Sequence, residues 1–301
     1  MMLRRSLFLT VVLAVTLLVP LARSQDSAPA NSQAPLNERR PPNWLENRRD
    51  GWGRPVKLPV KGEKSPPAPK RDLSGIWDPG DGGIQALGPA AMPDDGRPEH
   101  NPPFTAAGLE ALKETKPSNG FRSTLATESN DPVIAGDPQG MPREDLFELR
   151  TVNILQTPVA IYLMYQFGRV WRVIWTDGRE VPKDAEPRWF GYSLGKWVDD
   201  YTFVVETTGL DERTWIDHAG RPHSDKLRVE ETFHRLDRDH LELSVLIDDP
   251  KFYTKPWIAL NKLVFNLEPQ TFDVREMFWE PSEFQTYNKL LGNEAAGEDE
   301  K

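Results

Sequence analysis

Residues 227–247, LRVEETFHRLDRDHLELSVLI, alternate apolar and polar side chains over two successive segments. In the first segment Leu227, Val229 and Phe233 share one face. In the second segment the shared face carries Leu241, Leu243, Val245 and Ile247. A period of two residues is typical of a β-strand that buries one of its faces. The stretch therefore predicts two consecutive strands.

The same period recurs through most of the chain from residue 151 onward, with turn signals such as Asp177-Gly178 and Ala219-Gly220 between the segments. Each further segment has one apolar face, and these faces are formed by Val159, Ile161, Leu163, Tyr165 and Phe167; Trp171, Val173 and Trp175; Tyr201, Phe203 and Val205; Leu263, Phe265 and Leu267; and Phe272, Val274 and Phe278. Many short strands without helices between them predict a mainly β fold, an antiparallel meander that forms a lipocalin-like barrel or a strongly curved sheet. One short helix is expected after Thr105, a suitable N-cap, and long N-terminal loops surround it.

The N-terminus has the features of a signal peptide, which we assign to residues 1–24. Arg4 and Arg5 precede an apolar run over residues 7–19, and Ala22-Arg23-Ser24 provides small residues at a cleavage site. The run is shorter than the ~20 residues that a membrane span needs, so we expect no stable membrane insertion after cleavage. The protein is therefore expected to be periplasmic or secreted.

Composition divides the remaining chain into three parts. Residues 25–71 are rich in proline and polar residues and are expected to form a disordered tether, on which Trp44 and Trp52 are candidates for docking onto the domain. Residues 72–290 form a single β-rich domain, and residues 291–301 form an acidic disordered tail. The chain has no cysteine, which excludes disulfides and thiolate chemistry, and its formal net charge of -9 argues against nucleic acid as a partner.

Three polar residues fall in register with apolar faces. Glu231 lies in the face of Val229 and Phe233, while Glu276 and Asn261 occupy similar positions in later segments. A buried carboxyl group has a raised pKa, which is how a general acid arises. The alternatives are that these carboxylates pair with inward arginines, such as Arg172 or Arg228, or that the register changes at a bulge.

The segment WIDHAGRPHS, residues 215–224, gathers further polar residues. Asp217, His218 and His223 could ligate zinc or a similar divalent cation. Asp217 and His223 could instead form a base with its orienting carboxylate, whereas no nucleophile elbow surrounds Ser224. The alternative is that Asp217 caps the turn and that the histidines are exposed to solvent.

Aromatic residues and one arginine form a third group near the turns: Arg179, Trp189, Tyr192, Trp197 and Trp215. Such side chains form a stacking platform for a ligand or plug the end of a barrel. The ten tryptophans of the chain favour the ligand.

Two resemblances follow from these motifs. The set DLSGIW (72–77), TDGR (176–179), GYSLGKW (191–197), TWIDHAGRPHS (214–224) and DPKFYTKPW (249–257) resembles a large family of secreted proteins common in soil bacteria, for which no activity is established. This resemblance implies export and a single domain. Gly75-x-Trp77 is similar to the first-strand signature of lipocalin-type barrels, which implies a tryptophan that closes the barrel base beneath an arginine.

We expect first a barrel that binds a small, partly apolar ligand in its interior, with Glu231 orienting the polar end of the ligand. Its binding residues would be Arg179, Tyr192, Trp197, Trp215, Asn261 and Glu276. The sequence specifies no cofactor and no oligomeric state.

Two other functions stay open. One is an enzyme, a hydrolase, lyase or isomerase, with Asp217 and His223 as the base and Glu231 or Glu276 as the acid. The other is an envelope interaction module that acts through the tether.

Overall fold

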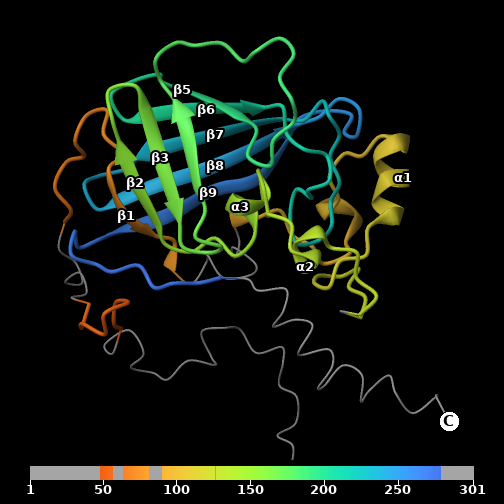
Figure 1. Ribbon diagram of the computed structural model, residues 1–301, viewed down its shortest axis with the longest axis horizontal. Helices are drawn as coiled ribbons and strands as arrows, with labels where there is room; N and C mark the ends of the chain where they lie inside the picture. Colours follow the sequence, from red (N-terminus) through yellow and green to blue (C-terminus); the bar gives the residue numbers. More distant parts are fainter. Residues whose placement is uncertain (1–47, 57–63, 81–89, 126, 279–301) are drawn as a thin grey trace, which may run out of the picture. The chain divides into compact units, whose positions relative to one another are not determined.

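In the described part of the chain, nine β-strands form a closed barrel (Figure 1). The computed structural model describes residues 48–56, 64–80, 90–125 and 127–278. The signal peptide, the acidic tail and much of the expected tether lie outside these residues. The strands are β1 (Gly75–Asp78), β2 (Val152–Gln156), β3 (Ala160–Tyr165), β4 (Trp171–Trp175), β5 (Tyr192–Trp197), β6 (Thr202–Thr208), β7 (Arg228–Arg235), β8 (His240–Asp248) and β9 (Trp257–Glu268). The predicted β-barrel is confirmed.

The barrel is a meander with one parallel pair, β4 and β5. Strand directions cannot alternate throughout a closed ring of nine members, because nine is odd, so at least one neighbouring pair must be parallel. Parallel strands need a long crossover connection, and residues 176–191 provide it. The pair is short: only Ile174–Ser193 and Trp175–Leu194 are in register. The expected all-antiparallel meander is wrong at this one position.

Apolar side chains from the strands fill the barrel interior. Val205, Val229, Val245 and Ile247 are fully buried, as the alternation predicts. A cavity in the core beside Trp77 has a volume of about 10 Å³, which is about enough for one water molecule. The core beside Trp77 is therefore packed, and the ligand inside the barrel stays a prediction.

Trp77 closes one end of the barrel and is completely buried. Its indole Nε1 donates a hydrogen bond of 2.9 Å to the carbonyl of Leu73. The guanidinium of Arg235 lies 4.7 Å from the centre of the Trp77 ring and donates to the carbonyls of Asp72 and Arg238. An arginine therefore lies against the buried tryptophan of the first strand.

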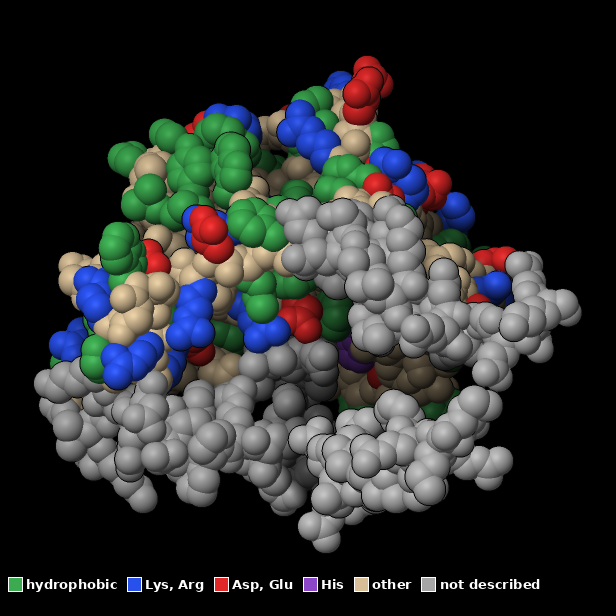
Figure 2. Space-filling model, turned by 60° about the horizontal axis from the view of Figure 1, so that its bottom comes forward, with side chains coloured by type: hydrophobic (Ala, Val, Ile, Leu, Met, Phe, Trp, Pro, Cys, Tyr) green, Lys and Arg blue, Asp and Glu red, His purple; other side chains and the backbone are tan. Residues whose placement is uncertain are grey.

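The aromatic face of β4 points outward. Trp171 is 64 % exposed, whereas Arg172 on the other face of the strand is 2 % exposed. Exposed apolar side chains continue on β2 and β3 at Leu155 and Met164, and Figure 2 shows hydrophobic side chains gathered over these strands. The period of two residues is thus correct for β4, but a charged side chain occupies the interior.

A bulge changes the register of β9. Its pairing with β8 shifts between Leu243 and Leu246, and Lys262 has a positive φ of 58°. Leu260 is therefore buried and Asn261 is exposed, which corrects the expectation that Asn261 points inward. The bulge was one of the alternatives that the sequence left open.

Residues 272–278 do not form the expected final strand. Met277 makes an isolated parallel bridge with Phe167, and Phe278 and Glu276 are exposed. The expectation that Glu276 points into an interior is wrong, because no ladder fixes an inward face in this segment.

The expected helix is α1 (Ala106–Glu114), and Thr105 caps it by accepting a hydrogen bond of 3.0 Å from the N–H of Gly108. Gly108 packs against the carbonyl of Phe252, where a Cβ would come within 2.2 Å of the oxygen. Three further helical turns were not predicted: η4 (Pro98–His100), α2 (Pro132–Ala135) and α3 (Arg143–Leu146). None of the helices in the described ranges is long and apolar enough to cross a membrane.

Candidate ligand-binding site

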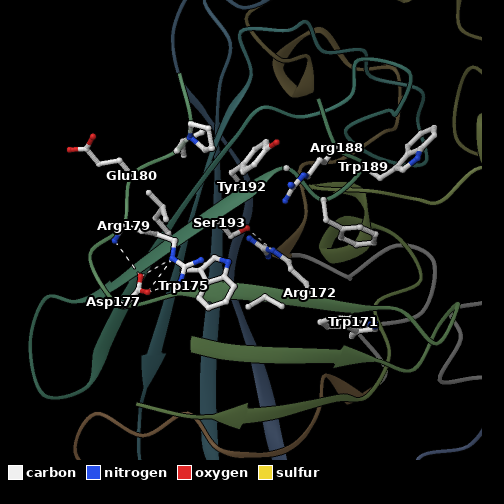
Figure 3. A pocket seen from close by; sticks show the side chains of 16 residues that line it. Trp171, Arg172, Trp175, Asp177, Arg179, Glu180, Arg188, Trp189, Tyr192 and Ser193 are labelled. Atoms are coloured by element: carbon white, nitrogen blue, oxygen red, sulfur yellow. Dashed lines mark hydrogen bonds and ion pairs between the residues drawn. The ribbon is translucent and has the colours of Figure 1, made fainter. Parts of the chain in front are cut away.

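A cleft of about 810 Å³ opens in the barrel wall where β4 and β5 diverge (Figure 3). The outward face of β4 forms one side, and residues 177–182 and 188–194 form the other. The cleft follows from the parallel pair, because the crossover must leave the end of β4 and return to the start of β5. Gly191 permits the return: its φ is 59°, and a Cβ would lie 2.6 Å from the carbonyl oxygen of Thr208.

Aromatic rings form the walls of this cleft. Trp171 stands at the rim and stacks on Tyr162 with their ring centroids 6.4 Å apart. Trp175 and Tyr192 lie deeper, from β4 and β5 respectively, together with Trp189 from the crossover. Large aromatic side chains gain most from covering a flat apolar surface, so this composition suits a partly apolar ligand.

Arg179 is fixed on the wall by two contacts. Its guanidinium lies 3.4 Å from the centre of the Trp175 ring and donates to Asp177 at 2.9 Å from Nε and 2.6 Å from Nη2. Hydrogen bonds from Arg179 lower the pKa of Asp177 to about 2. The charge of Arg179 is thus already compensated by its neighbour (Figure 3).

Arg172 forms the floor of the cleft and reaches into the barrel. Its guanidinium donates to both carboxylate oxygens of Glu231, at 2.8 and 2.5 Å, and to the hydroxyls of Ser193 and Thr207 at 3.0 and 2.7 Å. Burial acts to lower the pKa of Arg172, but the Glu231 carboxylate raises it overall. The pairing of Glu231 with an inward arginine is confirmed, so Glu231 is engaged and not a free acid.

A second buried carboxyl group lies behind this pair. The Tyr165 hydroxyl donates to Oδ1 of Asp145 at 3.0 Å. Oδ2 of Asp145 lies 4.0 Å from Nη1 of Arg172 and has no hydrogen-bond partner. Burial and the Glu231 charge raise the pKa of Asp145 well above its ordinary value, which favours the protonated form. No periodic pattern marks Asp145, because it lies in the short helix α3, outside the strands.

Asp217 caps its own turn, as one alternative predicted. Its carboxylate accepts from the N–H of Ala219 at 3.0 Å and from Nη1 of Arg221 at 2.7 Å. Burial acts to raise the pKa of Asp217, and Arg221 lowers it overall. The carboxylate is directed to Arg221, so the structure does not bring Asp217 and His223 together as a base and its orienting group.

His223 is a buried structural residue, 2 % exposed. Its Nδ1 faces the carbonyl of Ser224 at 3.1 Å, and its Nε2 lies 2.6 Å from the Thr214 hydroxyl. Because a carbonyl only accepts, Nδ1 carries the proton that it donates to Ser224. The Thr214 hydroxyl lies within hydrogen-bonding distance of both Nε2 and the Asp211 carbonyl. Burial lowers the pKa of His223. The alternative of an exposed histidine is wrong here, and His218 is partly buried, stacked on Phe147 at 5.6 Å.

Ser224 is also engaged, since its hydroxyl donates to Asp249 at 2.8 Å. Across the described ranges, no three histidine, aspartate or glutamate side chains are arranged to hold a metal ion. Asp217, His218 and His223 therefore do not form the metal site that their spacing suggested.

The structure divides the predicted ligand-binding residues between several places. Arg179 and Tyr192 line the cleft. Trp197 packs on Phe203 with ring centroids 5.2 Å apart, and Trp215 is buried beneath the guanidinium of Arg143 at 5.4 Å. As described above, Asn261 and Glu276 are exposed on other segments.

The sequence analysis did not assign Trp171, Trp175 and Arg188 to the site. A signal for the two tryptophans was present: if Arg172 pairs inward with Glu231, the residues at odd-numbered offsets from it, Trp171 and Trp175, must face outward. Arg188 lies in an irregular segment with no period, so nothing in the sequence pattern marked it.

In comparisons with known proteins, no family model, no curated protein and no solved structure matches this chain. Function must therefore be argued from the site itself, because a barrel fold alone supports many activities.

Proposed function

We propose that this protein binds a small, partly apolar ligand in the cleft between β4 and residues 177–194, and that it does so as a secreted or periplasmic protein. Export is supported by the charged start, the apolar run over residues 7–19 and the small residues before Gln25. The ligand proposal rests on the geometry of the cleft.

The observation that carries the proposal is an aromatic cleft of the right size. Its volume of about 810 Å³ falls within the range of about 300–1,000 Å³ that is common for small-molecule sites. At its rim Trp171 exposes 64 % of its surface. Exposing a large aromatic side chain forgoes the free energy of its burial, and a ligand that covers Trp171 would recover it.

The cleft is also largely pre-formed. Arg179 holds Trp175 on one wall, and the Arg188 guanidinium lies 4.2 Å from the centre of the Tyr192 ring on the other. The backbone of Arg188 is held by hydrogen bonds with Gly209 and Asp211. A pre-formed site loses less conformational entropy on binding.

The test is a titration with N-phenyl-1-naphthylamine, an uncharged aromatic probe whose fluorescence rises in apolar surroundings. Wild-type protein should give a saturable rise, and Trp171→Ala should weaken binding by on the order of tenfold through the lost aromatic contact. Trp52→Ala is the matched control, because Trp52 is 78 % exposed and does not line the cleft. The proposal fails if the wild type shows no saturation or if Trp171→Ala binds the probe as tightly as Trp52→Ala.

A further inference from the structure

We infer that the ligand carries an anionic group, such as a carboxylate, which Arg188 binds. This inference rests on the proposed function, since it names the chemical class of the ligand for the same cleft. The evidence is which charged side chains line the cleft and which of them are already paired with a side chain of opposite charge.

Two of the three arginines in the cleft already have a carboxylate. Arg172 is paired with Glu231 in the barrel interior, and Arg179 is paired with Asp177 on the wall. Each pair is held by two or more hydrogen bonds. Neither guanidinium is free to neutralise a ligand without losing its present partner.

Arg188 is the third arginine. Within the described ranges its guanidinium makes no ion pair and no hydrogen bond, and its contact is the face of the Tyr192 ring. A guanidinium has N–H groups along its edges that can donate in parallel to two oxygen atoms of one anionic group. The side chain is therefore oriented and lacks an acceptor.

Glu180 is the remaining acidic side chain in the cleft lining, apart from Asp177. Figure 3 shows Glu180 at the opposite end of the site from Arg188, with its carboxylate directed away from the arginine. The end of the cleft beside Tyr192 and Trp189 thus has a positive charge that no side chain compensates. A ligand with an aromatic or apolar body against Trp171 and Trp175 and an oxyanion at Arg188 would match both features.

The test compares two probes with the same rings, uncharged N-phenyl-1-naphthylamine and 1-anilinonaphthalene-8-sulfonate, which carries one negative charge. Wild-type protein should bind the sulfonate more tightly, by on the order of tenfold, because a charge-assisted hydrogen bond to arginine is added. Arg188→Gln should weaken binding of the sulfonate more than binding of the uncharged probe and so remove most of this preference, since only the sulfonate makes a charge-assisted hydrogen bond to Arg188. Arg188→Lys should restore part of the preference, because it keeps the charge and loses the paired N–H groups.

Arg213→Gln is the matched control. Arg213 also stacks on an aromatic ring, 4.4 Å from the centre of Trp189, but it is paired with Asp211 at 2.7 Å. Its substitution should change neither affinity.

The outcomes separate the two proposals. If neither probe binds saturably to the wild type, the proposed function fails. If both bind with equal affinity, or if Arg188→Gln weakens both probes equally, the cleft binds ligands but the inference of an anionic ligand is overturned.

Discussion

Two pairs of adjacent strands in the barrel, β7 with β8 and β4 with β5, differ in strand direction, in length of pairing and in which side chains they bury. β7 and β8 are antiparallel, share eight residue pairs in register and bury alternate side chains along their whole length. β4 and β5 are parallel, share two pairs, and β4 directs its aromatic side chains outward. The long ladder holds the barrel together, whereas the short one leaves an opening that is lined by aromatic rings. The difference separates the best-paired part of the barrel wall from the part that holds the cleft, in which we propose that a ligand binds.

One ion pair connects these two regions, because Arg172 comes from β4 and Glu231 from β7. Side chains alternate along a strand, so an inward Arg172 requires that Trp171 and Val173 face outward. The buried pair therefore specifies which face of β4 lines the cleft. Such a pair contributes little net stability compared with apolar side chains, but it is costly to break.

The largest effect is expected from breaking this pair on one side. Glu231→Leu leaves the Arg172 guanidinium buried without its hydrogen-bonded carboxylate and should lower the free energy of unfolding by about 3–5 kcal/mol. The double variant Arg172→Met/Glu231→Leu should recover most of that loss, because neither charge is then buried. Urea unfolding followed by tryptophan fluorescence measures both differences.

Arg228 on the outer face of β7 provides the control for this prediction. It forms ion pairs with Glu206, Glu230 and Asp248, in which every partner is partly exposed. Arg228→Met should therefore cost less than about 1 kcal/mol. A double variant that is as unstable as Glu231→Leu would show that the network specifies more than the orientation of β4.

The same comparison explains what the sequence could predict of the fold. Along β7 and β8 the ladder is complete, one face is buried, and the period of two residues correctly gave Val229, Phe233 and Leu243 as core. Along β9 a bulge shifted the register, and Asn261 moved to the surface. A bulge adds one residue to a strand without a mark in the hydrophobic pattern.

The site was less predictable, and for a physical reason. Alternation identifies two faces of a strand but not which of them is inside, so Trp171 and Trp175 were taken with the other apolar faces. Only the pairing of Arg172 with Glu231 decides the matter, and it joins strands that are far apart in sequence. The crossover that carries Arg179 and Arg188 has no period, although three members of the predicted aromatic group, Arg179, Trp189 and Tyr192, line the cleft.

A smaller effect is expected from comparing one large side chain in each region. Leu243→Ala in β8 removes a side chain that is 1 % exposed and should cost about 2–5 kcal/mol through lost burial and a cavity. Trp171→Ala in β4 removes a larger side chain that is mostly exposed, and should cost less than about 1 kcal/mol. Urea unfolding measures both losses. Equal losses would mean that the Trp171 side chain contributes to stability as much as Leu243 does. This would contradict the view that β8 stabilises the core while the outer face of β4 lines the cleft.

The last effect depends on pH and concerns Asp145, which lies beside the ion pair that links the two regions. Its pKa is raised in the folded protein by burial and by Glu231, so the folded state keeps a proton that the unfolded chain releases above about pH 4. Unfolding then releases this proton, and the free energy of unfolding falls as the pH rises from about 4 through the folded pKa, by about 1.4 kcal/mol for each unit of that shift. Asp145→Asn removes the titration and resembles the protonated acid. The free energy of unfolding of Asp145→Asn, relative to that of the wild type, should therefore increase with pH. Urea unfolding of both proteins at several pH values between 4.5 and 8 measures this difference. A difference that stays constant over this range would show that Asp145 is ionised in the fold and that Arg172 shares its charge between two carboxylates.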